Sequence, residues 1–211
     1  MGSSSNLIMT LQNDYILGLW GADGYHRTSS IGLTSIYPEL VERFYLFFKT
    51  KFSLSRVRLR IYTNDGEKTE LSSSMNWYRG KVVFCKGTKL RTLAYQIYVN
   101  SRPLLREFRE AITNRLMISS QSIPEYFSGR FDGDGSVAKD LRTDFRIVYA
   151  NFREAKIDKA MLKKIGINNS QVYRYRAART YVLYVSRYES EALCKLLKPY
   201  SAKLSGLLVT P

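Results

Sequence analysis

Histidine and cysteine are scarce in this chain of 211 residues, which holds one histidine, His26, and two cysteines, Cys85 and Cys194. A single histidine excludes zinc sites built from His/Cys clusters. It also leaves no Ser-His-Asp or Cys-His catalytic set unless His26 is itself the base. The cysteines are far apart and follow no metal-ligand spacing, so we expect two buried free thiols.

Long hydrophobic runs are also missing. No apolar segment approaches the roughly 18 residues that a membrane span requires. The opening Met-Gly-Ser-Ser-Ser lacks the charged and apolar regions of a secretory signal. We therefore expect a soluble, intracellular, cytoplasmic protein with no membrane partner. The hydrophobic content of 45% is enough for one sizeable core or two small ones that share an interface.

Positive charge, by contrast, is abundant. The formal net charge is +15, and a surface of this sign attracts polyanions, most often nucleic acid. Residues 1–120 carry 17 basic and 9 acidic side chains, and residues 121–211 carry 16 and 9, so the two halves favour the same kind of partner. The alternative is a generic basic protein that its charge keeps soluble.

One unusual pattern occurs twice, as Ile-Leu-Gly-Leu-Trp-Gly-Ala-Asp-Gly at residues 16–24 and as Phe-Ser-Gly-Arg-Phe-Asp-Gly-Asp-Gly at residues 127–135. Each copy follows a tyrosine and ends in a small residue, Asp and Gly. Such self-similarity indicates two diverged copies of one structural unit.

The segments after each motif have similar patterns. Periodicity predicts α+β repeats in which each half has the order helix, two strands, helix, two strands, helix. The predicted helices cover 39–48, 102–116, 153–165 and 189–197, and the predicted strands lie within 25–36, 56–63, 81–99, 137–149 and 171–187. The repeats span 14–117 and 124–211, with a flexible N-terminus at 1–13 and a linker at 118–123. Residues 64–80 form a long polar insertion in the first half only, which is typical of a functional or mobile loop.

The motif spacing places small residues on one helical face: Gly18 and Ala22 are four apart, as are Gly129 and Gly133. Glycine inside a helix costs about 1 kcal/mol relative to alanine. Close approach of a second helix would offset that cost, so we expect the two motif helices to pack together along these faces. The alternative is two unrelated glycine-rich turns.

Asp23 and Asp134 fall in the last turn of their predicted helices, each before a glycine. A carboxylate there opposes the helix dipole, and two converging carboxylates repel each other. Bound divalent cations would remove both penalties, and two metal-binding carboxylates on a basic protein suit phosphodiester hydrolysis. The alternative is that each Asp caps a turn or pairs with a nearby arginine.

The repeated motif and the order of elements resemble the single-chain LAGLIDADG homing endonucleases, particularly the compact archaeal ones. The first copy matches that family's motif closely, and the second has Arg130 where an aliphatic residue is usual. The resemblance implies paired motif helices at the interface of two pseudo-symmetric αββαββα repeats, and antiparallel β-saddles that hold DNA.

The same resemblance implies a set of site residues. Asp23 and Asp134 would be catalytic and bind Mg²⁺, with the backbone carbonyls of Ala22 and Gly133, and Mn²⁺ or Ca²⁺ would substitute in binding. Asp132 also falls in the second motif, but its position on another face of the helix indicates a structural role. The candidates for polar or basic residues around the metals are Asn151, Arg115 and Lys203.

Alternating strands supply candidates for the DNA surface. In residues 56–64, Arg and polar side chains alternate with apolar ones, which predicts one basic face. Arginine on a two-stranded ribbon in the major groove can bind guanine through two hydrogen bonds. Asp144 would accept from cytosine or orient its neighbours. Arg174 and Arg176 are predicted to share a strand face, as are Arg179 and Arg187. The full set of predicted contacts is Arg56, Arg58, Arg60, Arg142, Asp144, Arg146, Arg174, Arg176, Arg179 and Arg187.

These features predict a monomeric, site-specific endonuclease that hydrolyses one phosphodiester per strand in double-stranded DNA with a long, partly asymmetric target. The main alternative is an intron maturase of the same fold that binds intron RNA. A DNA-binding regulator without cleavage is a third interpretation, although loss of the motif acids would be its signature.

Overall fold

The computed structural model describes residues 4–68, 75–87, 92–137 and 144–206, and for residues before Asp14 only the backbone. The chain divides into two compact units, one made of residues 1–22 and 111–205 and the other of residues 23–110 and 206–211. We call them unit 1 and unit 2. Within the described residues, no helix is both long and apolar enough to cross a membrane.

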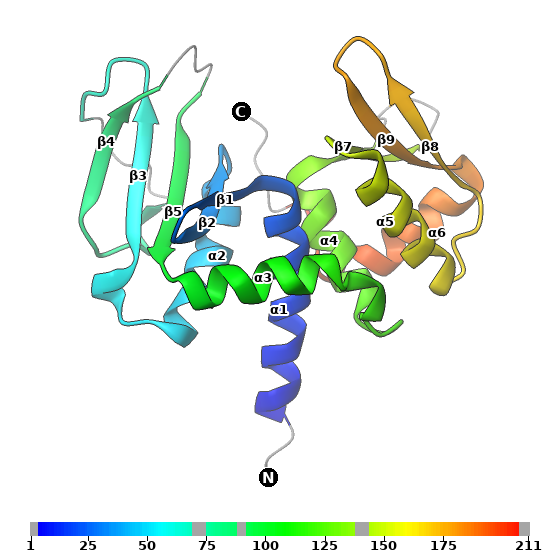
Figure 1. Cartoon of the computed structure of the whole chain (residues 1–211), viewed down its shortest axis with the longest axis horizontal. Coiled ribbons are helices and arrows are strands. Elements are labelled where there is room, and N and C mark those ends of the chain that lie inside the picture. Colours follow the sequence, from blue (N-terminus) through cyan, green and yellow to red (C-terminus); the bar gives the residue numbers. More distant parts are fainter. Residues whose placement is uncertain (1–3, 69–74, 88–91, 138–143, 207–211) are drawn as a thin grey trace. The chain divides into compact units, whose positions relative to one another are not determined.

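The described residues of the first half form three α-helices and five strands, labelled in Figure 1. In order they are α1 (Ser4–Asp23), β1 (Gly24–Arg27), β2 (Ser30–Ser35), α2 (Pro38–Lys51), the 3₁₀ turn η1 (Leu54–Arg56), β3 (Arg58–Thr63), β4 (Val82–Lys86), β5 (Ala94–Asn100) and α3 (Arg102–Thr113). Helix α1 begins within the segment expected to be a flexible terminus.

Where the structure describes it, the second half repeats the plan with one strand fewer. Its elements are the 3₁₀ turn η3 (Arg115–Met117), α4 (Ile123–Asp134), β6 (Gly135–Val137), β7 (Phe145–Tyr149), α5 (Phe152–Lys164), β8 (Ser170–Tyr175), β9 (Thr180–Val185) and α6 (Arg187–Leu197). Residues 118–122, inside the expected linker, connect η3 to α4. The α+β class and the αββαββα order of this half are confirmed.

The sheet of unit 2 has the order β1-β2-β5-β3-β4, and it differs from the expected antiparallel saddle. Strand β4 pairs with β3 in parallel, with Arg60 opposite Val83. The single run expected over residues 81–99 is two strands, β4 and β5, so the first half reads αββαβββα and its sheet is mixed. Strand β4 thus runs beside β3 in the same direction although a long insertion separates them in the sequence, an arrangement that local alternation does not reveal.

Helix α2 covers the apolar face of this sheet. Pro38 lies at its start, where a backbone N–H would make no hydrogen bond within the helix. Lys49 and Lys51 lie in its last turn, where their positive charges interact favourably with the helix dipole. Its buried rings pack on α3, with Phe44 and Phe47 at 6.5 and 5.6 Å from Phe108 between ring centroids. The sheet contributes the fully buried side chains Ile31, Leu33, Leu59, Ile61, Ile97 and Val99.

The end of the insertion between β3 and β4 packs on α2 as well. The rings of Trp77 and Tyr78 lie 5.0 and 5.6 Å from that of Tyr45, and the Tyr78 hydroxyl donates to the Val57 carbonyl at 3.1 Å. Residues 69–74 lie outside the described part of the chain. Aromatic contacts therefore anchor the described end of the insertion, residues 75–80, on helix α2.

The sheet of unit 1 is antiparallel, in the order β6-β7-β9-β8. Strand β7 alternates between buried and exposed side chains, so Phe145, Ile147 and Tyr149 face the core. Phe131 of α4 stacks on Phe145 at 4.8 Å, and α4, α5 and α6 cover this face of the sheet. The core thereby fixes α4, whose last residue is Asp134, to the strands that follow it.

Candidate active site and nucleic-acid interface

Helices α1 and α4 cross at their glycines within unit 1, as the motif spacing predicted. A Cβ added to Gly18 would lie 1.9 Å from the carbonyl oxygen of Tyr126, and one added to Gly129 would lie 2.0 Å from that of Tyr15. Gly21, which we had not placed at this interface, lies beside the side chains of Ile112 and Arg130. The absence of side chains at Gly18 and Gly129 is therefore what allows the two backbones to touch.

We expect Gly18→Ala and Gly129→Ala each to lower the free energy of unfolding by about 3 kcal/mol, because the added methyl meets a backbone carbonyl that no rotamer change can move. Urea denaturation of the purified variants measures the loss. Gly166→Ala is the contrasting variant, because its Cβ would meet nothing within 4 Å and only the positive φ of 85° opposes it. Equal stability of all three would contradict the close crossing.

The two motif acids end their helices, as predicted. Asp23 is the last residue of α1 and Asp134 the last of α4, and both are half-buried. Burial raises the pKa of Asp134, and the charges of Arg130 and Lys203 partly offset that rise. No side-chain contact identifies Ala22 as an interface or ligand residue, so its assignment stays a prediction.

Asp132 is fully buried, and its carboxylate joins three parts of unit 1. It accepts from the Tyr15 hydroxyl of α1 at 2.6 Å and from the Ser201 hydroxyl at 2.5 Å. It also accepts from the backbone N–H groups of Ala202 and Lys203 at 2.7 and 3.1 Å. This geometry accords with the structural role inferred for Asp132 from its place in the motif.

Of the three accessory candidates, only Lys203 lies at the end of a motif helix. Its ammonium donates to the backbone carbonyls of Phe131, Gly133 and Gly135 at 3.2, 3.1 and 3.0 Å. Asn151 instead caps α5, where its side chain accepts from the Arg153 N–H at 2.8 Å. These contacts make Asn151 a helix cap.

Arg115 belongs to a buried network that the sequence did not reveal. Its Nε is 2.6 Å from Asp158, and Arg130 Nε is 3.7 Å from the same carboxylate. The Tyr149 hydroxyl donates to Asp158 at 2.8 Å, and the Arg130 guanidinium lies over the Tyr149 ring at 4.5 Å. The charge of Arg130, the unusual residue of the second motif, is thus held by Asp158 and Tyr149 inside unit 1.

The sheet of unit 2 presents the basic face predicted for its strands. Arg58 and Arg60 alternate with buried Leu59 and Ile61 on β3. The Arg60 guanidinium lies 4.7 Å from the Tyr98 ring and donates to Gln96 at 3.4 Å. Arg56 was wrongly assigned to this strand: it ends η1, where it lies over Phe52 at 4.8 Å and donates to the Asn100 carbonyl at 3.2 Å.

The arginines of unit 1 are arranged less regularly than predicted. Arg146 on the exposed face of β7 pairs with Asp144 at 3.2 Å, and the Tyr184 hydroxyl donates to Asp144 at 2.9 Å, so this buried carboxylate orients its neighbours. Arg179 and Arg187 do not share a strand face, because they flank β9 at its two ends. Arg174 lies on β8, Arg176 follows it, and Arg142 lies outside the described residues.

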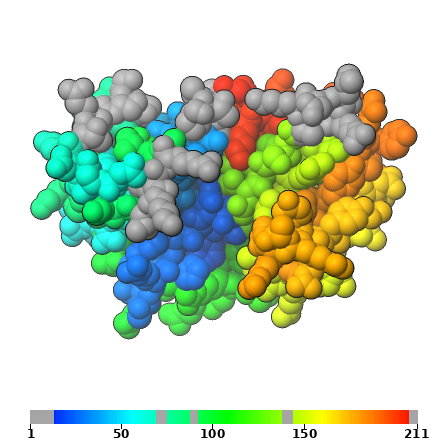
Figure 2. Space-filling view, turned by 90° about the horizontal axis from the view of Figure 1, so that it is seen from above, coloured from blue at the N-terminus to red at the C-terminus, as the bar shows by residue number. Residues whose placement is uncertain are grey.

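The β8–β9 hairpin is prominent on the surface of unit 1 (Figure 2). It carries exposed Tyr173 and Tyr175 beside its arginines. Aromatic rings beside arginines are a common feature of nucleic-acid surfaces, where bases and sugars pack on them. Tyr173 and Tyr175 were missing from the predicted contacts, although their alternation with Arg174 and Arg176 was visible in the sequence.

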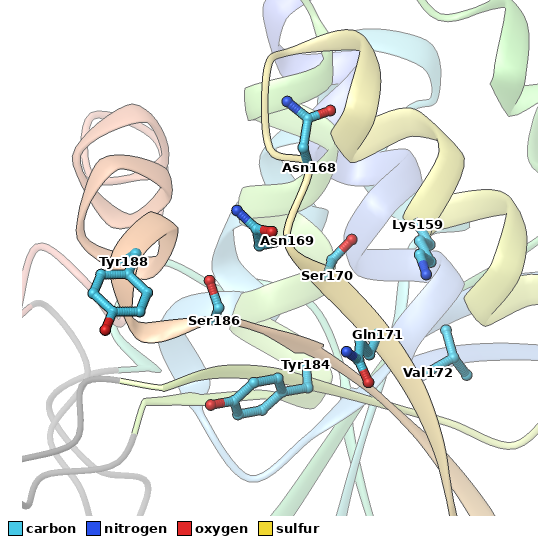
Figure 3. A pocket seen from close by; sticks show the side chains of 9 residues that line it. All are labelled: Lys159, Asn168, Asn169, Ser170, Gln171, Val172, Tyr184, Ser186 and Tyr188. Atoms are coloured by element: carbon cyan, nitrogen blue, oxygen red, sulfur yellow. The ribbon is translucent and has the colours of Figure 1, made fainter.

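Unit 1 also contains a cavity of about 630 Å³ at the end of this hairpin, lined by residues of α5, β8, β9 and α6 (Figure 3). Its lining mixes polar and apolar surface and includes Lys159, Ser170 and Tyr184. The Ser170 hydroxyl is buried and has no hydrogen-bond partner among the described residues. None of the lining residues belongs to α4, so the cavity is separate from the motif.

The two predicted thiols, Cys85 and Cys194, are free and half-buried. Among the described residues, no group of three His, Cys, Asp or Glu side chains is placed to hold a metal ion. Mg²⁺ is commonly bound through one or two carboxylates and retained water.

Comparison with solved structures identifies the architecture as a LAGLIDADG-type fold. The homing endonuclease I-DmoI in complex with DNA and Mn matches with a TM-score of 0.62 and 14% identity, over 90% of this chain and 97% of that one. The I-DmoI complex with DNA and Ca matches with a TM-score of 0.65 and 14% identity, over 94% and 97%.

The same fold is shared with a second group of proteins. Full-length DUF199/WhiA from Thermatoga maritima matches with a TM-score of 0.57 and 13% identity, over 98% of this chain and 60% of that one. The N-terminal LAGLIDADG domain of DUF199/WhiA matches with a TM-score of 0.55 and 13% identity, over 90% and 81%. No family model and no curated protein sequence matches the chain.

Proposed function

We propose that the protein is a site-specific, metal-dependent endonuclease that binds double-stranded DNA as a monomer and cuts both strands. The observation that carries this proposal is the close crossing of α1 and α4 at Gly18 and Gly129, because each of these helices ends in a half-buried aspartate. Solved complexes of I-DmoI, which shares the fold, contain DNA with Mn or Ca.

The residues at the end of α4 fit a divalent ion in part. The Asp134 carboxylate offers a hard oxygen ligand of the kind that Mg²⁺ prefers. The Gly133 carbonyl, the expected second ligand, already accepts from Lys203. In this proposal Asp23 and Asp134 would hold the metal, which would supply an activated water and stabilisation of the leaving oxygen.

DNA would be held by the exposed faces of the sheets. On β3, Arg58 and Arg60 offer charge, and the Tyr98 ring beneath Arg60 fixes the guanidinium in place. On β7, the ion pair with Asp144 likewise fixes the Arg146 guanidinium in place. Fixed arginines lose little side-chain entropy on binding, which suits recognition of base edges as well as phosphates.

The test is to incubate the protein with Mg²⁺ and the DNA that flanks its own gene, in a form that lacks the intron. We expect a double-strand cut at one position and none in DNA of shuffled sequence. A protein that leaves this DNA intact but binds it tightly would support the second candidate, sequence-specific binding without cleavage. The contact between Lys203 and the Gly133 carbonyl favours that candidate. Preferential binding of intron RNA would support a maturase.

Replacing Arg58 and Arg60 by Ala should weaken DNA binding and reduce the slope of log K against log salt by roughly 1 for each lost phosphate contact. Both side chains lie on the polar face of β3, so the fold should persist. The measurement is fluorescence anisotropy over a salt series. Arg106→Ala, at an exposed position of α3, is the matched control. Unchanged affinity and slope in the double variant would remove β3 from the DNA interface.

A further inference from the structure

The carboxyl end of α4 carries its own cation. The Lys203 ammonium has three protons, and it contacts three backbone carbonyls, those of Phe131, Gly133 and Gly135, at 3.2, 3.1 and 3.0 Å. A helix end concentrates negative partial charge on its last carbonyls. Lys203 therefore already binds the Gly133 carbonyl, the atom that was expected to be a metal ligand.

The position of Lys203 is fixed by the motif itself. Asp132 accepts from the Ser201 hydroxyl and from the N–H groups of Ala202 and Lys203, so the segment after α6 is tied to α4 two residues before Asp134. The Tyr15 hydroxyl of α1 completes the set of donors to this buried carboxylate. Asp132 holds the backbone of Lys203 and three carbonyls hold its ammonium, so this charge is a fixed feature of unit 1.

A second cation lies beneath the same helix end. Arg130 is one turn before Asp134 on α4, and its side chain is only 3% exposed. It is held by Asp158 and by the face of Tyr149. The charges of Arg130 and Lys203 both favour the ionised form of Asp134 and lower its pKa, against the effect of burial. The aspartate thus has resident positive charge near it before any metal binds.

We propose that the Lys203 ammonium competes with divalent metal for the carboxyl end of α4, so that metal binds the second motif only by displacing or tolerating this charge. The inference rests on the proposed function and deepens it. An ion that used the Gly133 carbonyl would lie within roughly 5 Å of the ammonium, given a metal–oxygen distance of about 2.1 Å. Two positive groups at that separation repel each other strongly in a half-buried site.

The test is metal affinity of the full-length protein without DNA, measured by calorimetry with Ca²⁺ and by electron paramagnetic resonance with Mn²⁺. Lys203→Met keeps the length of the side chain and removes its charge. We expect one site to bind at least about 10-fold more tightly in this variant. Lys198→Met, which removes an exposed cation just after α6, should leave the affinity unchanged.

Two further variants assign the gain to this place. Lys203→Arg keeps the charge and should show no gain, and Lys203→Met combined with Asp134→Asn should lose it. If Lys203→Met folds poorly for want of the helix cap, Lys203→Gln gives the same comparison, because its amide can still donate to the carbonyls while being neutral.

Equal or weaker metal binding by the neutral Lys203 variants would overturn the inference. If the wild-type protein nevertheless binds metal and cleaves DNA, the inference alone fails and the proposed function stands. If neither the wild-type protein nor the variants bind metal and no DNA is cut, both fail together.

Discussion

Replacing Asp23 or Asp134 by Asn should abolish double-strand cleavage, with a loss of more than about 100-fold, while DNA binding persists. Asparagine has nearly the shape of aspartate but no charge, so the affinity for a hard divalent cation falls while the helix end is preserved. The loss is large because the metal would supply both the nucleophile and the stabilisation of the leaving oxygen, effects worth several kcal/mol.

Stability distinguishes this catalytic role from a structural one. Burial raises the pKa of Asp134 despite Arg130 and Lys203, so the folded protein binds that proton more tightly than the unfolded chain. The stability that this proton supplies is complete below the unfolded-state pKa and is lost as pH rises through the folded-state pKa. At neutral pH, Asp134→Asn should therefore melt at the same temperature as the wild-type protein or slightly higher.

The experiment is a plasmid-cleavage assay in Mg²⁺ beside a melting curve for each variant. Glu107→Gln, which removes one carboxylate from an exposed position of α3, is the control and should cut normally. Full cleavage by either aspartate variant would refute the assignment, and reduced stability with partial activity would indicate a structural acid. Nicking by one variant would show that each acid serves a different strand.

Short-range patterns explain which parts of the fold and site could be predicted. The spacing of Gly18 and Gly129 within their motifs was enough to predict the helix crossing, because a helix face repeats over a few residues. Alternation predicted Arg58 and Arg60 on one face for the same reason. Asn151 was instead interpreted as a residue near the metals, although it lies directly before α5 and its side chain caps that helix.

The failures involve partners far apart in the sequence. The parallel pairing of β4 with β3 crosses an insertion, so alternation within either strand carries no sign of it. Lys203 meets Gly133 across 70 residues, and Arg115 meets Asp158 across 43. The sequence shows that Arg130 is an unusual residue in its motif, but only the fold shows that the Asp158 carboxylate balances its charge.

Asp158 is where that compensation can be tested, because one buried carboxylate serves two buried arginines. It is fully buried and lies in α5, and its partners Arg115, Arg130 and Tyr149 come from η3, α4 and β7. Removing one member of such a group leaves the other charges buried without a counter-ion, which costs more than the pairing itself stabilises.

We therefore expect Asp158→Asn to lower the free energy of unfolding by about 3–5 kcal/mol and the melting temperature by roughly 10 °C or more. Combining it with Arg115→Met should restore part of the loss, since one of the two uncompensated charges is then gone. Glu191→Gln, which breaks the exposed pair with Lys195, should leave stability within experimental error of the wild type. If Asp158→Asn proves as mild as Glu191→Gln, water or rearrangement must compensate the arginines, and Arg130 would then not be a fixed charge beneath the motif.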